Sequence, residues 1–489
     1  MIQKIIARVA LDKGEAVPMY QQLGDAICRM AEEGYLKPNE KLPPIRKLAE
    51  ALGVNNVTVV NAYKYLESKK IVYSAIGSGT YLAELHVKDR PLVSVDVLQR
   101  QMQMRLNGQE GNGEIINFAK GSAPAALFPV DAFKELFNQV LERDRGNAFG
   151  NEHIQGYGPL REALCDYAAG FGIAATSDRI QVISGAQQGI DIIAKAVLSP
   201  GDVVLVESPT YYGAAGAFLS RGAQLVEAPL QEDGLDIARL TALIKAYRPK
   251  ILYTMPYFQT PTCINTSMEK KRKILELAYQ YDFYVMEEDN QSDFNFSETE
   301  IVPLKALDYK NKVIYIKSFS RILMPGLRLG FMILPKAALT QVLSAKYTTD
   351  IETSGFMQKA FHLFLNSREW DIHMAKMRRM YRERYDAMSK AVRRYLQKGF
   401  DYKIPGGGLH FWLALNEEQG ANQFCNQLAQ RGVVVYPGSF FMLDGRDIPN
   451  IRLSFANVEE DRIEEGVRRI GQAMTDRGCS SSGEPSVRG

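Results

Sequence analysis

The stretch YIKSFSR, residues 315–321, is followed closely by MPGLRLG, residues 324–330. Its first half has the apolar residues of a buried strand, and its second half has the proline and glycines of a loop. Arg321 and Arg328 stand seven residues apart in this loop. A guanidinium stays protonated at any working pH and has no free amine to condense with an aldehyde. We therefore expect a strand that ends in a polar loop, with positive charge but no reactive amine at residue 321.

The same strand-and-loop pattern recurs from residue 116 to residue 475. Apolar runs alternate there with amphipathic helical patterns, and four of the runs are residues 180–183, 203–206, 251–253 and 283–286. Strands separated by helices predict an α/β domain with a mostly parallel central sheet. Residues 476–489 are rich in serine and glycine and are predicted to form a disordered tail.

Length and composition restrict the class of protein. A chain of 489 residues is too long for one ordinary domain, and 46% hydrophobic with 24% charged residues is typical of a soluble globular protein. The sequence shows no apolar run that would span a bilayer and no signal peptide, so we expect a cytoplasmic protein with no membrane partner. Five scattered cysteines and five histidines lack metal-ligand spacing, so no metal site is predicted. The net charge of +3 neither demands nor excludes nucleic acid.

Residues 15–85 have a different pattern from the rest of the chain. Two helical patterns are followed by a third that Asn55 or Asn56 can cap, and two short β-type runs then flank the GSG sequence of residues 77–79. This order predicts a helix, a helix-turn-helix and a two-stranded wing. Residues 86–115 include a polar, glycine-containing run and are predicted to form a linker.

Three motifs in this region resemble the GntR-type winged helix-turn-helix domain: LPPIRKLA at residues 42–49, TVVNAY at residues 58–63 and GSGT at residues 77–80. The resemblance implies that the third helix enters the major groove of double-stranded DNA. The implied base-reading residues are Asn55, Asn56, Thr58 and Asn61. The implied phosphate contacts are Arg46 and Lys64, and the implied wing contacts are Gly77, Ser78 and Gly79.

Some of these residues have simpler interpretations. Asn55 and Asn56 can serve as helix caps alone, and Arg46 can be a solvated surface charge. The GntR family usually has an arginine where Asn56 stands, so a specific arginine–guanine contact is not expected here. A protein–protein role for the whole module is the remaining alternative.

The larger region resembles the fold-type I pyridoxal phosphate (PLP) enzymes, the aminotransferases. The resemblance is carried by residues 154–161 (IQGYGPLR), 184–188 (SGAQQ), 207–213 (ESPTYYG), 255–262 (MPYFQTPT), 286–294 (MEEDNQSDF), 315–330 and 451–455 (IRLSF). In this family a lysine follows Ser-Phe-Ser and holds the cofactor as a Schiff base, whereas Arg321 stands there in this chain. The sequence therefore predicts no catalytic residue at this position.

The resemblance also implies which residues surround the cofactor. The implied cofactor-binding residues are Gly185, Ala186, Gln187, Tyr211, Thr260, Glu288, Asp289, Ser318, Ser320 and Arg328. Thr260 replaces the asparagine that often contacts the ring hydroxyl, and either Glu288 or Asp289 takes the place of the aspartate beside the pyridine nitrogen. Lys317 alternates away from the serines along the strand and is not expected to replace the missing lysine. Two alternatives are that Tyr211 is a core aromatic residue and that Arg452 forms a structural salt bridge instead of binding a substrate carboxylate.

Together these domains resemble the MocR subfamily of transcriptional regulators. The resemblance implies a homodimer that binds operator DNA, with an aminotransferase-like domain that senses an effector such as an amino acid or a PLP-like molecule. We expect PLP to bind noncovalently or to be lost. The alternative is an active PLP-dependent aminotransferase that carries a DNA-binding domain.

Overall fold

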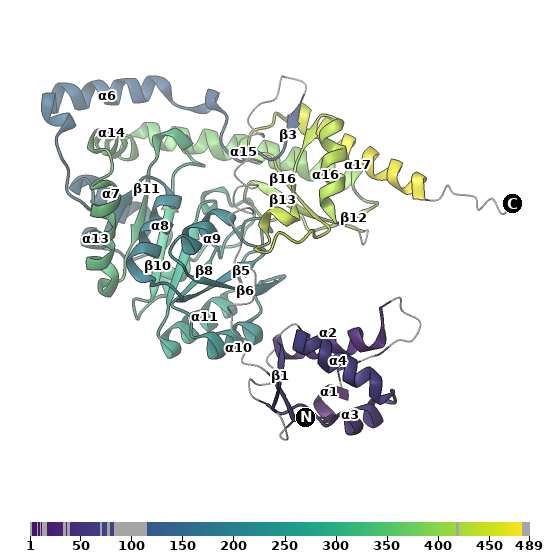
Figure 1. Ribbon diagram of the computed structural model, residues 1–489. Helices are drawn as coiled ribbons and strands as arrows, with labels where there is room; N and C mark the ends of the chain where they lie inside the picture. Colours follow the sequence, from purple (N-terminus) through teal and green to yellow (C-terminus); the bar gives the residue numbers. More distant parts are fainter. Residues whose placement is uncertain are drawn as a thin grey trace. The chain divides into compact units, whose positions relative to one another are not determined.

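The computed structural model describes residues 2–6, 8–9, 11, 17–32, 36, 40–68, 71–75, 79–82, 115–416 and 420–481. The chain divides into two compact units, residues 1–92 and residues 93–489, and Figure 1 shows the elements of each. The predicted linker lies almost wholly outside the described residues, as do Gly77 and Ser78 of the predicted wing.

The N-terminal unit has the predicted helices and hairpin and one helix more. Its elements are α1 (Ile2–Ile6), α2 (Met19–Glu32), α3 (Ile45–Leu52), α4 (Asn56–Ser68), β1 (Val72–Ala75) and β2 (Gly79–Leu82). The two strands are antiparallel, with Val72 opposite Leu82. Ile5 of α1 is fully buried in the same hydrophobic cluster as Leu48 and Val59. The unit therefore begins before residue 15, where the sequence pattern placed its start.

The turn between α3 and α4 has the geometry of a helix-turn-helix. Gly53 follows α3 with φ of 63°, a left-handed conformation that glycine adopts without a Cβ clash. The Tyr63 hydroxyl of α4 donates a hydrogen bond to the backbone oxygen of Pro43 at 2.7 Å. Because Tyr63 is buried, this bond fixes α4 against the segment that leads into α3.

The second unit is built on an eight-stranded sheet in the order β4-β11-β10-β9-β8-β5-β6-β7. Strands β10, β9, β8, β5 and β6 are parallel, whereas β11 is antiparallel to both of its neighbours and β7 is antiparallel to β6. The sheet strands are β4 (Ile180–Ile183), β5 (Val203–Ser208), β6 (Gln224–Gln231), β7 (Gly234–Leu235), β8 (Ile251–Thr254), β9 (Tyr284–Asp289), β10 (Val313–Ser318) and β11 (Gly330–Ile333). A mostly parallel α/β sheet is confirmed.

Helices cover both faces of this sheet (Figure 1). Helices α8 (Ala186–Val197), α9 (Tyr212–Leu219) and α13 (Leu339–Asp350) share one hydrophobic cluster with the sheet. Helices α10 (Ile237–Tyr247) and α11 (Met268–Tyr281) share another. The strands are buried on both faces, which explains their nearly continuous apolar sequences.

A four-stranded sheet, in the order β12-β13-β16-β15, completes the larger unit. Its strands are β12 (Phe400–Tyr402), β13 (His410–Leu415), β16 (Asn450–Ser454) and β15 (Tyr436–Pro437), and β14 (Val433–Val434) pairs with β3 (Ile116–Asn117). The other α-helices described in this unit are α6 (Val130–Asp144), α7 (Gly158–Ala169), α12 (Leu304–Leu307), α14 (Gly355–Leu365), α15 (Arg368–Tyr395), α16 (Ala421–Gln430) and α17 (Glu460–Ser481). Helix α17 continues to Ser481, so it extends into the segment from residue 476 that was predicted to form the tail.

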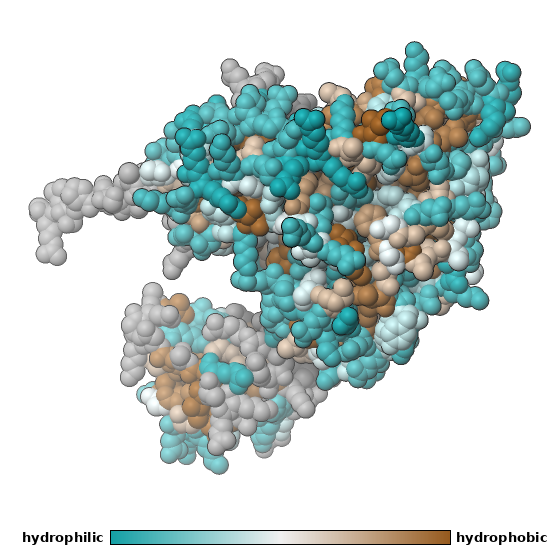
Figure 2. Space-filling model, turned by 180° about the vertical axis from the view of Figure 1, so that it is seen from behind, coloured by the Kyte–Doolittle hydropathy of each residue, from teal (hydrophilic) through white to brown (hydrophobic). Residues whose placement is uncertain are grey.

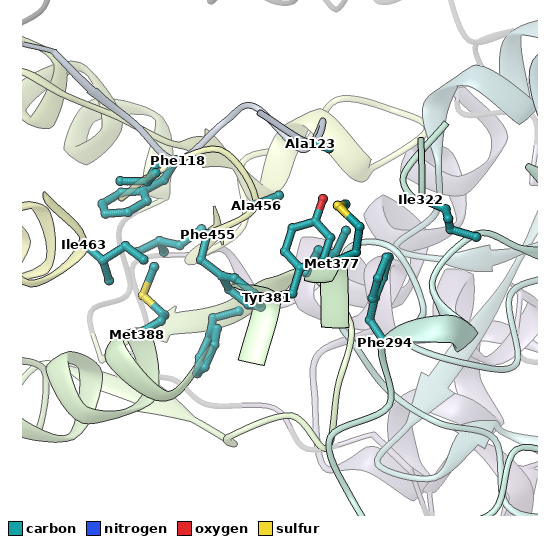
Figure 3. Close-up of a cluster of buried hydrophobic side chains, with 14 of the residues drawn as sticks. Phe118, Ala123, Phe294, Ile322, Met377, Tyr381, Met388, Phe455, Ala456 and Ile463 are labelled. Carbon is teal, nitrogen blue, oxygen red and sulfur yellow. The ribbon is translucent and has the colours of Figure 1, made fainter. Parts of the chain in front are cut away.

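The core joins the beginning of the larger unit to its last helices. Figure 3 shows Phe118 beside Phe455 and Ile463, and Tyr381 of α15 close to Phe294. The rings of Phe294 and Tyr381 meet edge to face, with centroids 4.6 Å apart. The loop after β3 is thus anchored in the core at Phe118 and again at Ala123, both of which are buried.

The surface of the larger unit is mixed in character. Figure 2 shows hydrophobic residues interspersed with hydrophilic ones on its rear face. Large side chains that are exposed include Phe149, Tyr309, Tyr347 and Ile351. None of the described helices has the length and apolar character needed to cross a bilayer.

Candidate ligand pocket and DNA-binding surface

The predicted pocket residues gather at the carboxyl ends of parallel strands. Residues that follow β5, β8, β9 and β10 meet there with the N-terminus of α8, although they come from widely separated parts of the sequence. Open α/β sheets bind ligands at this edge because loops and helix N-termini converge there.

Arg328, Ser184 and Gly185 form one end of this pocket. The Arg328 Nη2 donates to the backbone oxygen of Ser184 at 2.5 Å. Gly185 precedes α8 with φ of 86°, and a Cβ at this position would lie 2.8 Å from Arg328 Nη2. Only a glycine allows this approach. The arginine is exposed, and the backbone N–H groups at the start of α8 are suited to an anion.

The two serines lie next to this arginine loop. Ser318 is the last residue of β10, and its Oγ donates to Ser320 Oγ at 3.1 Å. The backbone N–H of Ser320 donates to Ser318 Oγ at 3.2 Å. Because Gly330 pairs with Ser318 across the two strands, the hydroxyl groups stay near the loop that carries Arg328. Hydroxyls, a guanidinium and a helix N-terminus together can hold a phosphate.

Tyr211 and Gln187 are in direct contact at the side of the pocket. The Tyr211 hydroxyl donates to Gln187 Oε1 at 3.3 Å, and Gln187 Nε2 donates to the backbone oxygen of Gly213 at 2.7 Å. Ala186 and Gln187 open helix α8, so this contact joins α8 to the loop after β5. The arrangement places an aromatic ring close to the helix N-terminus.

Glu288 and Asp289 point to opposite faces of the sheet. Asp289 pairs with Lys317 across the parallel strands β9 and β10, and Glu288 pairs with Ile316. The Glu288 carboxylate accepts hydrogen bonds from the Tyr253 hydroxyl and from Asn290 Nδ2. Burial raises the pKa of Glu288, although its hydrogen bonds and the charge of Arg321 act in the opposite direction. Glu288 is therefore the acidic residue on the Arg321 side.

Lys317 is fully buried in an ionic cluster on the other face. Its Nζ lies 2.6 Å from Asp293 Oδ2 and 3.1 Å from Asp289 Oδ2, and it donates to Ser292 Oγ at 2.8 Å. Burial alone would lower the pKa of Lys317, but the two aspartates raise it. A lysine held charged in this way has no lone pair available to attack an aldehyde.

Thr260 lies close to a residue that the sequence analysis missed. Gln291 Nε2 donates to Thr260 Oγ1 at 3.4 Å and to the backbone oxygen of Phe258 at 3.1 Å. Gln291 Oε1 accepts a hydrogen bond from the backbone N–H of Leu409 at 2.8 Å. This buried amide ties the end of β9 to the loop before β13. Gln291 lies within a run of polar residues, five residues after Met286, and nothing in the sequence distinguishes it from its polar neighbours.

Arg321 and Arg452 bind the same short loop. The Arg321 Nη1 donates to the backbone oxygen of Gly121, and Arg452 Nη2 donates to the backbone oxygen of Ala119 at 2.8 Å. A Cβ on Gly121 would lie 2.6 Å from Arg321 Nη1, so a larger residue there would displace the guanidinium. Burial lowers the pKa of Arg452 to about 10, and the charge of Arg321 acts in the same direction.

His410 is a second residue that the sequence analysis did not identify. It is buried at the start of β13, and its Nε2 has no hydrogen-bond partner. Burial holds the pKa of His410 well below its ordinary value, and the charges of Arg452 and Arg321 lower it further. The imidazole is therefore neutral at pH 7 and lies near both guanidinium groups.

These contacts test whether PLP suits the pocket. The Arg328 end of the pocket suits the phosphate of PLP. Gly185 has no Cβ, and a Cβ at this position would fill the space beside the Arg328 guanidinium. The Arg321 end does not suit covalent attachment, because Arg321 has no reactive amine and Lys317 lies on the opposite face of the sheet. Among the described residues, no group of three or more His, Cys, Asp or Glu side chains is arranged to hold a metal ion.

The N-terminal unit exposes most of the predicted DNA contacts on α3 and α4. Arg46, Asn55, Asn56, Asn61 and Lys64 are exposed, and Thr58 is partly exposed. Gly79 begins β2. Arg46 lies on α3 and Gly79 on β2, whereas the other described positions lie at the start of α4 and along it.

Two details refine this surface. The Asn55 Oδ1 accepts a hydrogen bond from the backbone N–H of Val57 at 3.0 Å, which is the capping role considered from the sequence. The side chain of Val57 is 60% exposed at the first turn of α4. An apolar group there can contact a thymine methyl group, and Val57 was not among the base-reading residues predicted from the sequence.

A winged helix-turn-helix and a fold-type I transferase sheet define a class of two-unit proteins with a DNA-binding part and a ligand-binding part. Residues 113–470 match the family described as aminotransferase class I and II, and the chain belongs to this family. Residues 19–82 match the bacterial regulatory proteins of the gntR family.

Relatives of two kinds resemble the chain. The aromatic-amino-acid aminotransferase 1 of Thermococcus litoralis is 31% identical over 74% of this chain and 88% of the relative. The probable rhizopine catabolism regulatory protein MocR of Rhizobium meliloti is 26% identical over 95% of this chain and 96% of the relative. The crystal structure of a multiple substrate aminotransferase from Thermococcus profundus covers 78% of this chain and 95% of its own, with 28% identity and a TM-score of 0.72.

The match to MocR is long enough to include both units, whereas the two aminotransferases cover about three quarters of the chain. The protein is therefore a DNA-binding transcriptional regulator with an aminotransferase-like domain. The aminotransferase fold belongs to a family that binds PLP and typically forms dimers.

Proposed function

We propose that this regulator senses a small-molecule effector in its aminotransferase-like domain, without covalent attachment of PLP. The observation that carries the proposal is the guanidinium of Arg321 directly after Ser318-Phe319-Ser320, where the family has its Schiff-base lysine. The burial of Lys317 between Asp289 and Asp293 supports it, because the nearest lysine in sequence is already engaged.

The proposed ligand contacts follow from the geometry of the pocket. Arg328, Ser318 and Ser320, with the N-terminus of α8, hold a phosphate, and Tyr211 lies against a ring. The effector's carboxylate binds Arg452. When PLP or a similar ring is bound, Glu288 faces the ring nitrogen. Its raised pKa makes it a weaker anionic partner than an ordinary aspartate, and a ring nitrogen beside it is less readily kept protonated.

The DNA-binding unit supplies the output of the proposed sensor. Helix α4 enters the major groove, with Asn55, Asn56, Thr58 and Asn61 near base edges and with Arg46 and Lys64 on phosphates. The regulator acts as a cytoplasmic homodimer of the MocR subfamily, and exposed side chains such as Phe149 offer apolar surface for self-association. The effector changes DNA binding only to the extent that its affinity differs between the two conformational states.

Absorbance spectroscopy with added PLP tests the loss of covalent binding. The unmodified protein is expected to show no Schiff-base absorbance, and borohydride should leave it unlabelled. The Arg321→Lys variant is expected to gain this absorbance and a reducible adduct on residue 321. Mass spectrometry that finds a PLP adduct on Lys317, or on any other lysine of the unmodified protein, would refute the proposal.

The sensing role needs a separate measurement on DNA. Gel retardation of the protein's own promoter region is expected to change when a bound effector is present. The active aminotransferase remains the competing function, because a relative with 31% identity is an aminotransferase. Turnover of an amino donor with a keto acid by the unmodified protein would favour that function over the sensor.

A further inference from the structure

Helix α15 concentrates positive charge in the larger unit. Its 28 residues include nine lysine and arginine residues and four aspartate and glutamate residues, which gives a net charge of +5. The whole chain has a net charge of only +3, so the rest of it is slightly acidic. At 1.5 Å per residue the helix is about 42 Å long, and Figure 1 shows it between α14 and α17. A surface of this length and charge can meet an extended anionic partner.

A groove of about 570 Å³ follows the second half of α15. It is lined by the basic residues Arg382, Lys390, Arg393 and Arg394, by the aromatic ring of Tyr385 and by Ile404. The four basic side chains are exposed to solvent. Lys390 lies three and four positions before Arg393 and Arg394, so these three side chains are neighbours on one face of the helix. Ser389 also lines the groove and its Oγ has no hydrogen-bond partner among the described residues, and a hydroxyl can donate to a phosphate oxygen.

The cations of this groove differ in whether they are paired. Asp386 also lines the groove, but its carboxylate pairs with Arg382 at 3.0 Å. Arg394 pairs with a glutamate of α17 at 3.0 Å. Among the described residues, no carboxylate forms an ion pair with Lys390 or Arg393. The groove therefore carries positive charge that an anionic partner would neutralise.

DNA is the polyanion that this class of regulator binds, and the recognition unit itself has little excess charge. Residues 19–82, which match the gntR family, contain eight lysine and arginine residues and six aspartate and glutamate residues, a net charge of +2. Sequence-independent affinity for DNA comes from lysine and arginine side chains that neutralise phosphates. A cationic groove on the larger unit adds to this affinity, which favours DNA over an acidic protein segment as the partner of α15.

We propose that the groove on α15 binds the phosphate backbone of DNA that flanks the segment occupied by α4. Lys390 and Arg393 each neutralise one phosphate, and the Ser389 hydroxyl donates to a phosphate oxygen. The contact is independent of the DNA sequence, because phosphates carry no base information. This inference goes beyond the sensing function, since the contact needs neither PLP nor an effector.

Fluorescence anisotropy of the full-length protein on two duplexes tests this contact. The short duplex is the part of the protein's own promoter region that the double variant Lys390→Gln with Arg393→Gln protects from nuclease. The long duplex adds about 20 base pairs on each side, more than the ~12 base pairs that a helix of ~42 Å can span. The double variant is expected to bind the long duplex about tenfold more weakly at low salt, and its salt slope should fall by about 2 for each protomer in contact. Its affinity for the short duplex should equal that of the unmodified protein.

Two further double variants assign the effect to the groove. Lys245→Gln with Arg272→Gln is the matched control, because it removes an exposed lysine and an exposed arginine from α10 and α11 of the same unit. This control should bind both duplexes like the unmodified protein. Lys390→Arg with Arg393→Lys keeps both charges and should retain the affinity for the long duplex. Equal losses in the control and in the groove variant would show that only the net charge matters, which refutes the site.

The outcomes separate this inference from the proposed function. If the groove variant binds the long duplex as tightly as the unmodified protein does, or loses affinity equally for both duplexes, the flanking contact is refuted. Loss of binding to a peptide of alternating glutamate and leucine, with DNA binding unchanged, would assign the groove to an acidic protein segment instead. PLP binding in calorimetry should be the same in every variant, so none of these results bears on the proposed sensor. If the unmodified protein binds neither duplex, the proposed output on DNA fails together with the site.

Discussion

Replacing Lys317 with methionine is expected to destabilise the larger unit strongly. Methionine keeps an unbranched apolar stem but removes the charge from Nζ, which lies 2.6 Å from Asp293 and 3.1 Å from Asp289 and donates to Ser292. The variant leaves two buried carboxyl groups without their cation. Breaking a buried pair by removing one partner costs about 3–5 kcal/mol. The free energy of unfolding should fall by about this amount at pH 7.

The pKa shifts in the cluster define the pH range of this effect. Burial opposes ionisation of Asp289, but Lys317 and the hydrogen bonds from Ser292 and Tyr315 hold its pKa below the ordinary value of about 3.9. A lowered pKa in the folded state gives stability that is present above the ordinary value and is lost as the pH falls through the folded one. Lys317 has a raised pKa, so its contribution is present below about 10.4 and is lost as the pH rises through the raised value. The difference between variant and unmodified protein should therefore be full near neutrality and should shrink in acid.

Urea denaturation followed by tryptophan fluorescence measures this effect in the larger unit, because both tryptophans, Trp370 and Trp412, lie there. Lys312→Met is the matched control. Lys312 pairs with Asp282, whose side chain is 85% exposed, and such surface pairs contribute about 0–1 kcal/mol. If Lys317→Met and Lys312→Met lower the unfolding free energy equally, the buried ion cluster does not have the role argued here.

Three further predictions concern the DNA surface and the phosphate end of the pocket. Arg46→Ala is expected to weaken DNA binding by a similar factor for all sequences and to reduce the salt slope by about 1, measured by fluorescence anisotropy at several salt concentrations; unchanged affinity would exclude Arg46 as a contact. Asn55→Ser keeps a side-chain oxygen for the N–H of Val57, so helix stability should persist while operator preference falls by about 1–3 kcal/mol if Asn55 reads a base; an unchanged preference would leave only the capping role. Arg328→Gln should weaken noncovalent PLP binding by about tenfold or more in calorimetry; equal affinity would show that the phosphate binds elsewhere.

The sequence predicted the fold class because its elements are locally encoded. Apolar runs bounded by helical patterns indicate a parallel sheet, and the turn residues of the first unit indicate a hairpin. The antiparallel strand β11 was not predicted, since the direction of a strand within a sheet depends on pairings between distant segments. Helix α1 was missed because five residues are too few for a clear period, although Ile5 fills the core of the unit.

The choice between Glu288 and Asp289 needed the register of two strands. Sequence alignment could not decide it, because a shift by one residue exchanges the faces to which the side chains point. In the structure Asp289 stands opposite Lys317, and the pair shares a face with Tyr315. From the sequence, Lys317 and Ser318 were predicted to point to opposite faces of the sheet because side chains alternate along a strand. Once the pairing of β10 with β9 is known, the same alternation assigns Asp289 and Glu288 to opposite faces.

Contacts made by Arg321 lay beyond any local pattern. Its partner Gly121 is 200 residues away in sequence, and Arg452 is 333 residues from Ala119. Such contacts depend on how β3 and its following loop are held by β14, which the sequence does not reveal. They matter for the chemistry, because a guanidinium at residue 321 preserves the positive charge of a lysine without its nucleophilic lone pair. Arg321 is partly exposed, Arg452 is buried, and the neutral imidazole of His410 lies near both. This positive charge fits the proposed sensor, in which an anionic ligand binds without covalent attachment.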